Sequence, residues 1–265
     1  MALPKAGGPV TGEHAAVVPS HVISAFQGKE GRAERAGHAW DNGWRIGSIV
    51  YARSGRVSTG WSAKLRTTLQ VEGVRIARPV RSTDGRFVVA GWNASTWIDG
   101  ELARRVDETV GVAVRLADAL AGQAPPPAPE VEDPFVLADR RAWEETAEEY
   151  RPLDVPLQVG HADLLASTIY HGTQAPAITD IIPCGAPRPH GYTAALVIVD
   201  GLIAGAVDDA IVDRFRHIPD IDQLLLRAVA YRRHLNDLHP DATSNARSHI
   251  RRVEDVLMLK LADTL

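Results

Sequence analysis

Hydrophobic residues recur at helical spacing through much of the second half of the chain. Amphipathic helices are predicted in this way over residues 106–120, 221–235 and 250–261. A further helix that starts at Thr193 is apolar on every side, so we expect it to be buried. Residues 135–150 are rich in charge and predict an exposed helix. The second half is therefore expected to be mostly helical.

Short strands dominate the first half. Between residues 37 and 53, turn formers alternate with bulky apolar residues, which is typical of two or three short strands. Residues 74–80 and 86–90 predict two more strands, joined as a hairpin by the turn formers Ser82-Thr83-Asp84-Gly85. Helical segments are expected at residues 19–26 and 61–69.

These patterns predict an α+β chain with a strand-rich N-terminal domain, residues 1–100, and a helical C-terminal domain, residues 101–265. The hydrophobic fraction of 45% and the charged fraction of 23% are those of an ordinary folded protein. A formal net charge of -4 gives no electrostatic reason to expect binding to nucleic acid or to an anionic membrane. The basic run Arg232-Arg233-His234 is accordingly interpreted as a solvated helix face.

The sequence also indicates where in the cell the protein is expected. The single Cys184 excludes an intrachain disulfide and a multi-cysteine zinc site. Residues 1–8 lack the apolar core of a signal peptide, and the longest apolar run, residues 192–207, is too short to span a bilayer. We therefore expect a cytoplasmic protein with no membrane partner.

Two carboxylates flank a predicted hairpin in the second half. Asp163, in the tripeptide His161-Ala162-Asp163, precedes a strand that begins at Ile169, and Asp180 follows the returning strand 177–179. Such a hairpin brings both carboxylates to the same end. Phosphoryl transfer needs that arrangement, with one carboxylate to accept a proton from the attacking hydroxyl and another to hold magnesium.

The hairpin and the order of elements resemble the protein-kinase-like fold, specifically its aminoglycoside phosphotransferase and choline kinase branch. The chain as a whole also resembles an uncharacterised actinobacterial family of such proteins. This resemblance implies a small antiparallel-sheet lobe followed by a larger helical lobe. It also implies that Asp163 is the catalytic base, Asp180 the principal magnesium ligand, and His161 the residue that shapes the loop.

In kinases a buried helix also carries an Asp that holds the catalytic loop, with a Gly five residues later. Asp200 and Gly205 repeat that spacing. The resemblance implies that Asp200 is buried and accepts hydrogen bonds from backbone N–H groups near residues 161–163. An Asp that faces solvent near the start of the helix is the alternative.

The chain departs from the family pattern at the positions that bind the nucleotide and its metal ions. Thr168 stands where the family has the Asn that holds a second metal, and its hydroxyl is a weaker ligand. Arg53 stands where a lysine should end the third strand, and the helix after it contains Lys64 but no Glu. A three-glycine loop is missing, and the tryptophans of segment 37–44 are more simply interpreted as packing the small lobe. Arg53 or Lys64 would have to contact the nucleotide phosphates.

These features leave three hypotheses. The first is a phosphotransferase that uses Mg²⁺ and ATP on a small hydroxyl-bearing substrate, with a degenerate nucleotide site. The second is a pseudokinase, a binding or regulatory protein of the same fold without catalysis or cofactor. The third is an unrelated α+β binding protein. The retained carboxylates favour the first, and the missing Lys, Glu, Asn and glycine loop favour the second.

Overall fold

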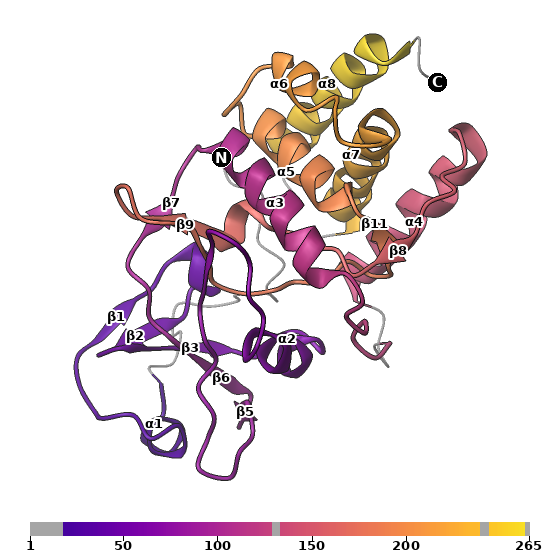
Figure 1. Cartoon of the computed structure of the whole chain (residues 1–265). Coiled ribbons are helices and arrows are strands. Elements are labelled where there is room, and N and C mark those ends of the chain that lie inside the picture. Colours follow the sequence, from indigo (N-terminus) through magenta and orange to yellow (C-terminus); the bar gives the residue numbers. More distant parts are fainter. Residues whose placement is uncertain (1–17, 129–132, 239–243, 263–265) are drawn as a thin grey trace. The chain divides into compact units, whose positions relative to one another are not determined.

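A computed structural model of the chain describes residues 18–128, 133–238 and 244–262. Residues 1–8, considered above for a signal peptide, lie outside the described residues. The chain forms two compact units (Figure 1). Of the described residues, the helical unit contains those of ranges 104–165 and 183–262, and the strand-rich unit contains ranges 18–103 and 166–182. The hairpin that precedes Asp180 therefore belongs to the strand-rich unit, although it lies far along the chain.

The strand-rich unit contains a five-stranded antiparallel sheet in the order β1-β2-β3-β6-β5. Its strands are β1 (Ala33–Arg35), β2 (Trp44–Ile46), β3 (Ile49–Arg53), β6 (Trp92–Thr96) and β5 (Val88–Val89). Successive side chains of β3 point to opposite faces, as strand geometry requires. Tyr51 packs into one hydrophobic cluster with helix α1 (Ser20–Ala25), and Val50 packs into another with Ile169. Both faces of β3 are therefore buried.

A second sheet of four strands, in the order β4-β10-β9-β7, completes this unit. Its strands are β4 (Arg75–Ile76), β10 (Ala177–Ile178), β9 (Thr168–Tyr170) and β7 (Glu101–Leu102). β9 and β10 form the predicted antiparallel hairpin, closed by a turn in which the Gln174 N–H donates to the His171 carbonyl at 3.0 Å. β10 also pairs in parallel with β4, and β9 pairs with β7. These pairings attach the hairpin to the strand-rich unit.

The predicted hairpin of residues 74–80 and 86–90 is wrong in its pairing. The turn itself forms, because the Gly85 N–H donates to the Ser82 carbonyl at 2.8 Å. However, β4 pairs with β10 and β5 pairs with β6, so the two strands join different sheets. Turn chemistry specifies a local reversal of the chain, whereas partner choice depends on contacts distant in sequence.

The helical unit is built around α5. Its helices are α3 (Val106–Leu120), α4 (Pro134–Glu149), α5 (Tyr192–Ile203), α6 (Ala210–Arg214), α7 (Ile221–Leu238) and α8 (Ser244–Lys260), with a two-stranded sheet of β8 (Leu157–Gln158) and β11 (Arg188–Pro189). α5 packs against α3, α7 and α8 (Figure 1), and all its residues except Leu202 are buried. The prediction of a buried, all-apolar helix is confirmed.

α4 differs from the expected exposed helix. It packs closely against α7, and its buried positions Ala138, Ala142 and Thr146 recur at helical spacing. This buried stripe is narrow and lies among charged residues, so the sequence did not predict it. Across the described part of the chain, no helix combines the length and apolar character that a membrane crossing requires.

The close approach of α5 to α3 predicts the outcome of one substitution. A Cβ at Gly201 would lie 2.6 Å from Cγ1 of Val106, whereas a Cβ at Gly111, also within a helix, would meet only the flexible end of Arg115 at 3.5 Å. We expect Gly201→Ala to lower the free energy of unfolding by about 1–3 kcal/mol through overpacking. Gly111→Ala should raise it by about 0.5–1 kcal/mol because alanine favours helix.

Urea denaturation of the two variants and the wild type measures both effects. Equal shifts of the same sign in the two variants would contradict this account of the α3–α5 contact.

Candidate functional site

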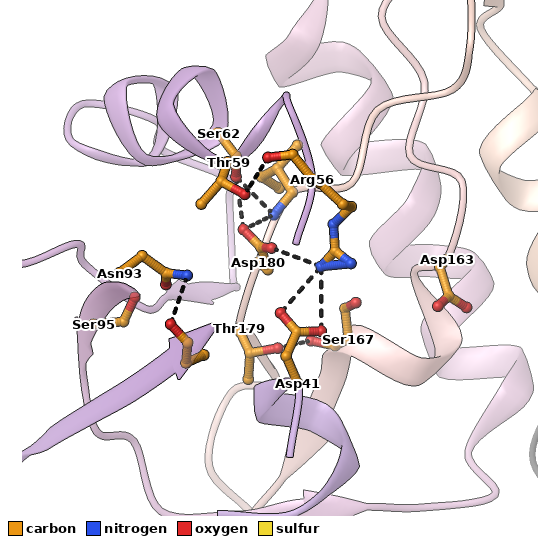
Figure 2. A network of polar contacts seen from close by, with 12 residues as sticks. Asp41, Arg56, Thr59, Ser62, Asn93, Ser95, Asp163, Ser167, Thr179 and Asp180 are labelled. Atoms are coloured by element: carbon orange, nitrogen blue, oxygen red, sulfur yellow. Dashed lines mark hydrogen bonds and ion pairs between the residues drawn. The ribbon is translucent and has the colours of Figure 1, made fainter. Parts of the chain in front are cut away.

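Asp180 lies just after β10, at the centre of a polar network in the strand-rich unit (Figure 2). Its Oδ1 accepts a hydrogen bond from the Ser62 hydroxyl at 2.7 Å and one from the Ile181 N–H at 2.9 Å. Ser62 belongs to α2 (Thr59–Arg66), the helix that follows β3. The carboxylate therefore joins the end of the second sheet to α2.

Arg66, at the end of the same helix, is the main charged partner of Asp180. Its side chain is only 3% exposed, and its Nε lies 3.3 Å from Oδ1 of Asp180. Its Nη1 donates to the backbone carbonyls of Ala77, at 2.7 Å, and Thr179, at 3.2 Å. Burial lowers the pKa of Arg66, and the charge of Asp180 is the strongest influence that raises it. Asp180 is thus the counter-ion of a buried cation.

Arg56 is a second cation at Asp180. It lies in the connection between β3 and α2, and its Nη2 is 3.3 Å from Oδ2 of Asp180. The same nitrogen donates to both oxygens of Asp41, at 3.0 and 3.2 Å. Asp41 follows the short helix η1 (His38–Trp40) and has a left-handed φ of 52°. Arg56 therefore bridges the β1–β2 connection and Asp180, as Figure 2 shows.

A magnesium ion does not fit Asp180 as these residues are arranged. Mg²⁺ prefers carboxylate oxygens and water in an octahedral shell. Here Oδ1 accepts two hydrogen bonds, and guanidinium groups lie 3.3 Å from each carboxylate oxygen. A divalent cation on this carboxylate would face two positive charges at short range.

The other residues predicted at the nucleotide site lie elsewhere in the strand-rich unit. Arg53 stacks on Trp92, with its guanidinium 4.4 Å from the ring centroid, and Lys64 is exposed on α2. Thr168 is buried in β9, opposite Ile178. The cations beside Asp180 are thus not the two expected ones, and the roles of Arg53, Lys64 and Thr168 stay predictions.

The tryptophans of segment 37–44 pack as the simpler interpretation predicted. Trp40 is buried and stacks on Trp97, with the ring centroids 5.2 Å apart. Trp44 lies at the edge of the cluster around α1, under the guanidinium of Arg35. Both rings therefore contribute to the core of the strand-rich unit.

The His161–Asp163 loop belongs to the helical unit and is held by specific hydrogen bonds. The His161 N–H donates to Oγ1 of Thr193, on α5, at 2.8 Å. The buried His161 ring accepts the Asp163 N–H at Nδ1, at 3.0 Å, so a neutral ring carries its proton on Nε2. His161 thus orients the backbone of Asp163.

Asp200 is buried, as predicted, but its partner differs from the expected backbone donors. Both of its oxygens accept hydrogen bonds from Arg232, on α7, at 2.7 and 2.6 Å. Nη2 of Arg232 also donates to the Ala162 carbonyl at 2.8 Å and lies 3.9 Å from Oδ1 of Asp163. Asp200 therefore supports the loop indirectly, by fixing the arginine that holds it. Burial alone would lower the pKa of Arg232, but the charge of Asp200 raises it above its ordinary value.

The sequence did not lead us to predict the buried arginines of the two units, although their helical spacing placed them on buried helix faces. Arg232 is only 4% exposed, so its assignment to a solvated face is wrong. It lies four residues after Ala228, on the apolar face of α7. Ser62 and Arg66 are likewise four residues apart on α2, on a buried face next to the one predicted from Trp61 and Leu65.

Comparison with solved structures identifies the fold. The structure of the GDP complex of wild-type aminoglycoside 2′-phosphotransferase-IIIa matches with a TM-score of 0.51 and 13% identity, over 90% of this chain and 96% of that one. A microcompartment-associated aminopropanol kinase matches at a TM-score of 0.47 and 13% identity, over 82% and 86% of the two chains. An ethanolamine kinase from Plasmodium vivax matches at 0.43 and 10%, over 84% and 78%.

No protein-family model and no curated relative matches the chain by sequence. The likeness to the phosphotransferase shows that the chain has the kinase-like fold of that aminoglycoside phosphotransferase. The expected fold class, α+β with an antiparallel sheet and a helical part, is confirmed.

The buried Arg232–Asp200 pair predicts a large and specific loss of stability. Arg232→Met should lower the free energy of unfolding by roughly 3–5 kcal/mol because it leaves Asp200 as an unpaired buried charge. In Arg232→Met/Asp200→Asn the charge is removed, so part of the loss should be recovered.

Arg216→Met is a suitable control, since Arg216 pairs with Asp213 at 2.9 Å but is 64% exposed. That variant should change stability by less than about 1 kcal/mol. Denaturant titration checks all three variants. Similar losses for Arg232→Met and Arg216→Met would contradict a buried ion pair.

Proposed function

We propose that this chain is a kinase-fold protein that acts by binding a ligand or partner, without metal-dependent phosphoryl transfer. The observation that carries the proposal is the engagement of Asp180 by Ser62 and Arg66. In kinases the corresponding carboxylate holds the metal that neutralises the transferred phosphate. In this chain the same type of residue neutralises an arginine.

The energetics support this assignment. Arg66 is buried, and removing one partner of a buried ion pair costs about 3–5 kcal/mol. If Asp180 turned to a metal, Arg66 would lose its nearest carboxylate while the metal added positive charge beside it. Metal binding would therefore oppose the packing of α2 onto the second sheet.

A second candidate function is a phosphotransferase that uses Mg²⁺ and ATP on a small hydroxyl-bearing substrate. The ordered His161–Asp163 loop favours it. His161, Thr193 and Arg232 fix the backbone of this loop by hydrogen bonds, as the positioning of a catalytic carboxylate requires. In this candidate Asp163 accepts the substrate proton, and Asp180 and Thr168 hold magnesium. Asp163 lies in the helical unit and Asp180 in the strand-rich unit, so their meeting at one phosphate stays a prediction.

Turnover assays distinguish the two functions. We expect the purified chain with MgCl₂ and either ATP or GTP to transfer no phosphate to aminoglycosides or amino alcohols above the rate of Asp163→Asn. Both nucleotides are included because the similar aminoglycoside 2′-phosphotransferase was solved with GDP. The physical reason is that Asp180 is the counter-ion of Arg66. If Asp180 held the metal, Arg66 would lose that counter-ion.

Asp163→Asn is the matched control because it keeps the size of the side chain and removes its basicity. A wild-type turnover that requires Mg²⁺ and disappears in Asp163→Asn would establish the phosphotransferase and overturn the proposal.

A further inference from the structure

A surface pocket lies between α7 and α8, two helices of the helical unit that pack against each other (Figure 1). Its volume is about 240 Å³, including the solvent at its mouth. Three residues of each helix line it, and they are Arg233, Asn236, Asp237, Arg247, Ile250 and Arg251. None of them belongs to the network around Asp180 or to the His161–Asp163 loop. The pocket is therefore a separate candidate site.

Asn236 brings a buried polar group without a partner to this pocket. The residue is only 8% exposed, yet its side chain makes no hydrogen bond in the described part of the chain. Buried polar side chains in folded proteins are hydrogen-bonded in the large majority of cases. A side-chain amide offers two N–H donors and one carbonyl acceptor. The Asn236 amide is thus available to a polar group that enters the pocket.

Arg251 is a cation of the pocket for which the described residues supply no counter-ion. It lies four residues after Arg247, so α8 places two positive charges on one face, an arrangement that costs stability. Asp237 pairs with Arg247 at 3.1 Å, and Arg233 pairs with glutamates of α4 and α8. Arg251 has no hydrogen bond or ion pair with any residue of the described ranges. An incoming anion would supply the missing charge.

The lining also limits the class of anion. A guanidinium binds a planar carboxylate through two parallel N–H donors, and an amide N–H adds a third. Asp237 lines the same pocket, so its charge opposes a group that carries two negative charges more than one that carries a single charge. Buried Ile250 adds an apolar wall that suits a carbon chain.

We propose that the pocket binds the carboxylate group of a small organic acid, with Arg251 and Asn236 as its donors. The inference goes beyond the proposed function, because it concerns other residues and needs neither a nucleotide nor a metal.

NMR spectra of the ¹⁵N-labelled full chain test the inference, with sodium acetate and sodium succinate as probes. The side-chain amide signal of Asn236 is identified by its absence from the spectrum of Asn236→Leu. We expect this signal to shift on addition of at least one of the two acids and to saturate in the millimolar range. Sodium chloride and sodium sulfate at equal ionic strength should produce no saturable shift.

Variants assign the donors. Arg251→Gln should weaken binding by about tenfold or more, because charge-assisted hydrogen bonds are lost. Arg252→Gln is the matched control, since Arg252 is the next residue of α8 and is exposed but does not line the pocket. It should leave the affinity unchanged.

Asn236→Leu tests the unpartnered amide separately. Leucine has a similar size and no polar atoms, so this variant should lose binding while its melting temperature stays unchanged or rises. A fall of several degrees would show that the amide already has a partner in the free protein.

Four results would overturn the inference: no saturable shift with either acid, an equal response to sulfate, equal losses of affinity in Arg251→Gln and Arg252→Gln, or that fall in melting temperature. None of these readouts involves turnover, nucleotide or metal. Failure of the carboxylate site is therefore distinguishable from failure of the proposed function.

Discussion

The buried guanidinium of Arg66 is the constraint on which the strand-rich unit depends. It donates to the carbonyl of Ala77, directly after β4, to the hydroxyl of Ser95 in β6, and to the Thr179 carbonyl after β10. One side chain thus joins α2 to both sheets. A buried positive charge is tolerated only with a counter-ion and satisfied donors. Asp180 is that counter-ion, and our proposal that this site does not hold magnesium follows from this pairing.

The residues to which the kinase resemblance gave a role therefore have different surroundings in the two units. In the helical unit, Asp200 and Arg232 hold the backbone before Asp163, so this loop is ordered. In the strand-rich unit, Arg56 and Arg66 pair with Asp180, the residue for which the resemblance predicted a metal. A binding protein on this fold needs the ordered scaffold but not the metal, so both observations are compatible with one function.

Much of the fold could be predicted from periodicity, because α3, α5 and the β9–β10 hairpin each have a strong local pattern. The partners of β4 and β5 could not, since strand pairing is decided by contacts distant in sequence. Asp163, Asp180 and Asp200 were identified by spacing and resemblance. Arg56, Arg66 and Arg232 were missed because arginine is normally exposed, and only their tertiary partners make their burial favourable.

Anomalous diffraction from crystals grown with MnCl₂ and ATP tests the central claim most directly, because Mn²⁺ occupies magnesium sites and its position is observed independently of the protein. The account predicts no manganese peak within bonding distance of the Asp180 carboxylate, with Arg66 still paired to Asp180. A manganese ion bound to Asp180, with Arg56 and Arg66 turned away from it, would contradict the account.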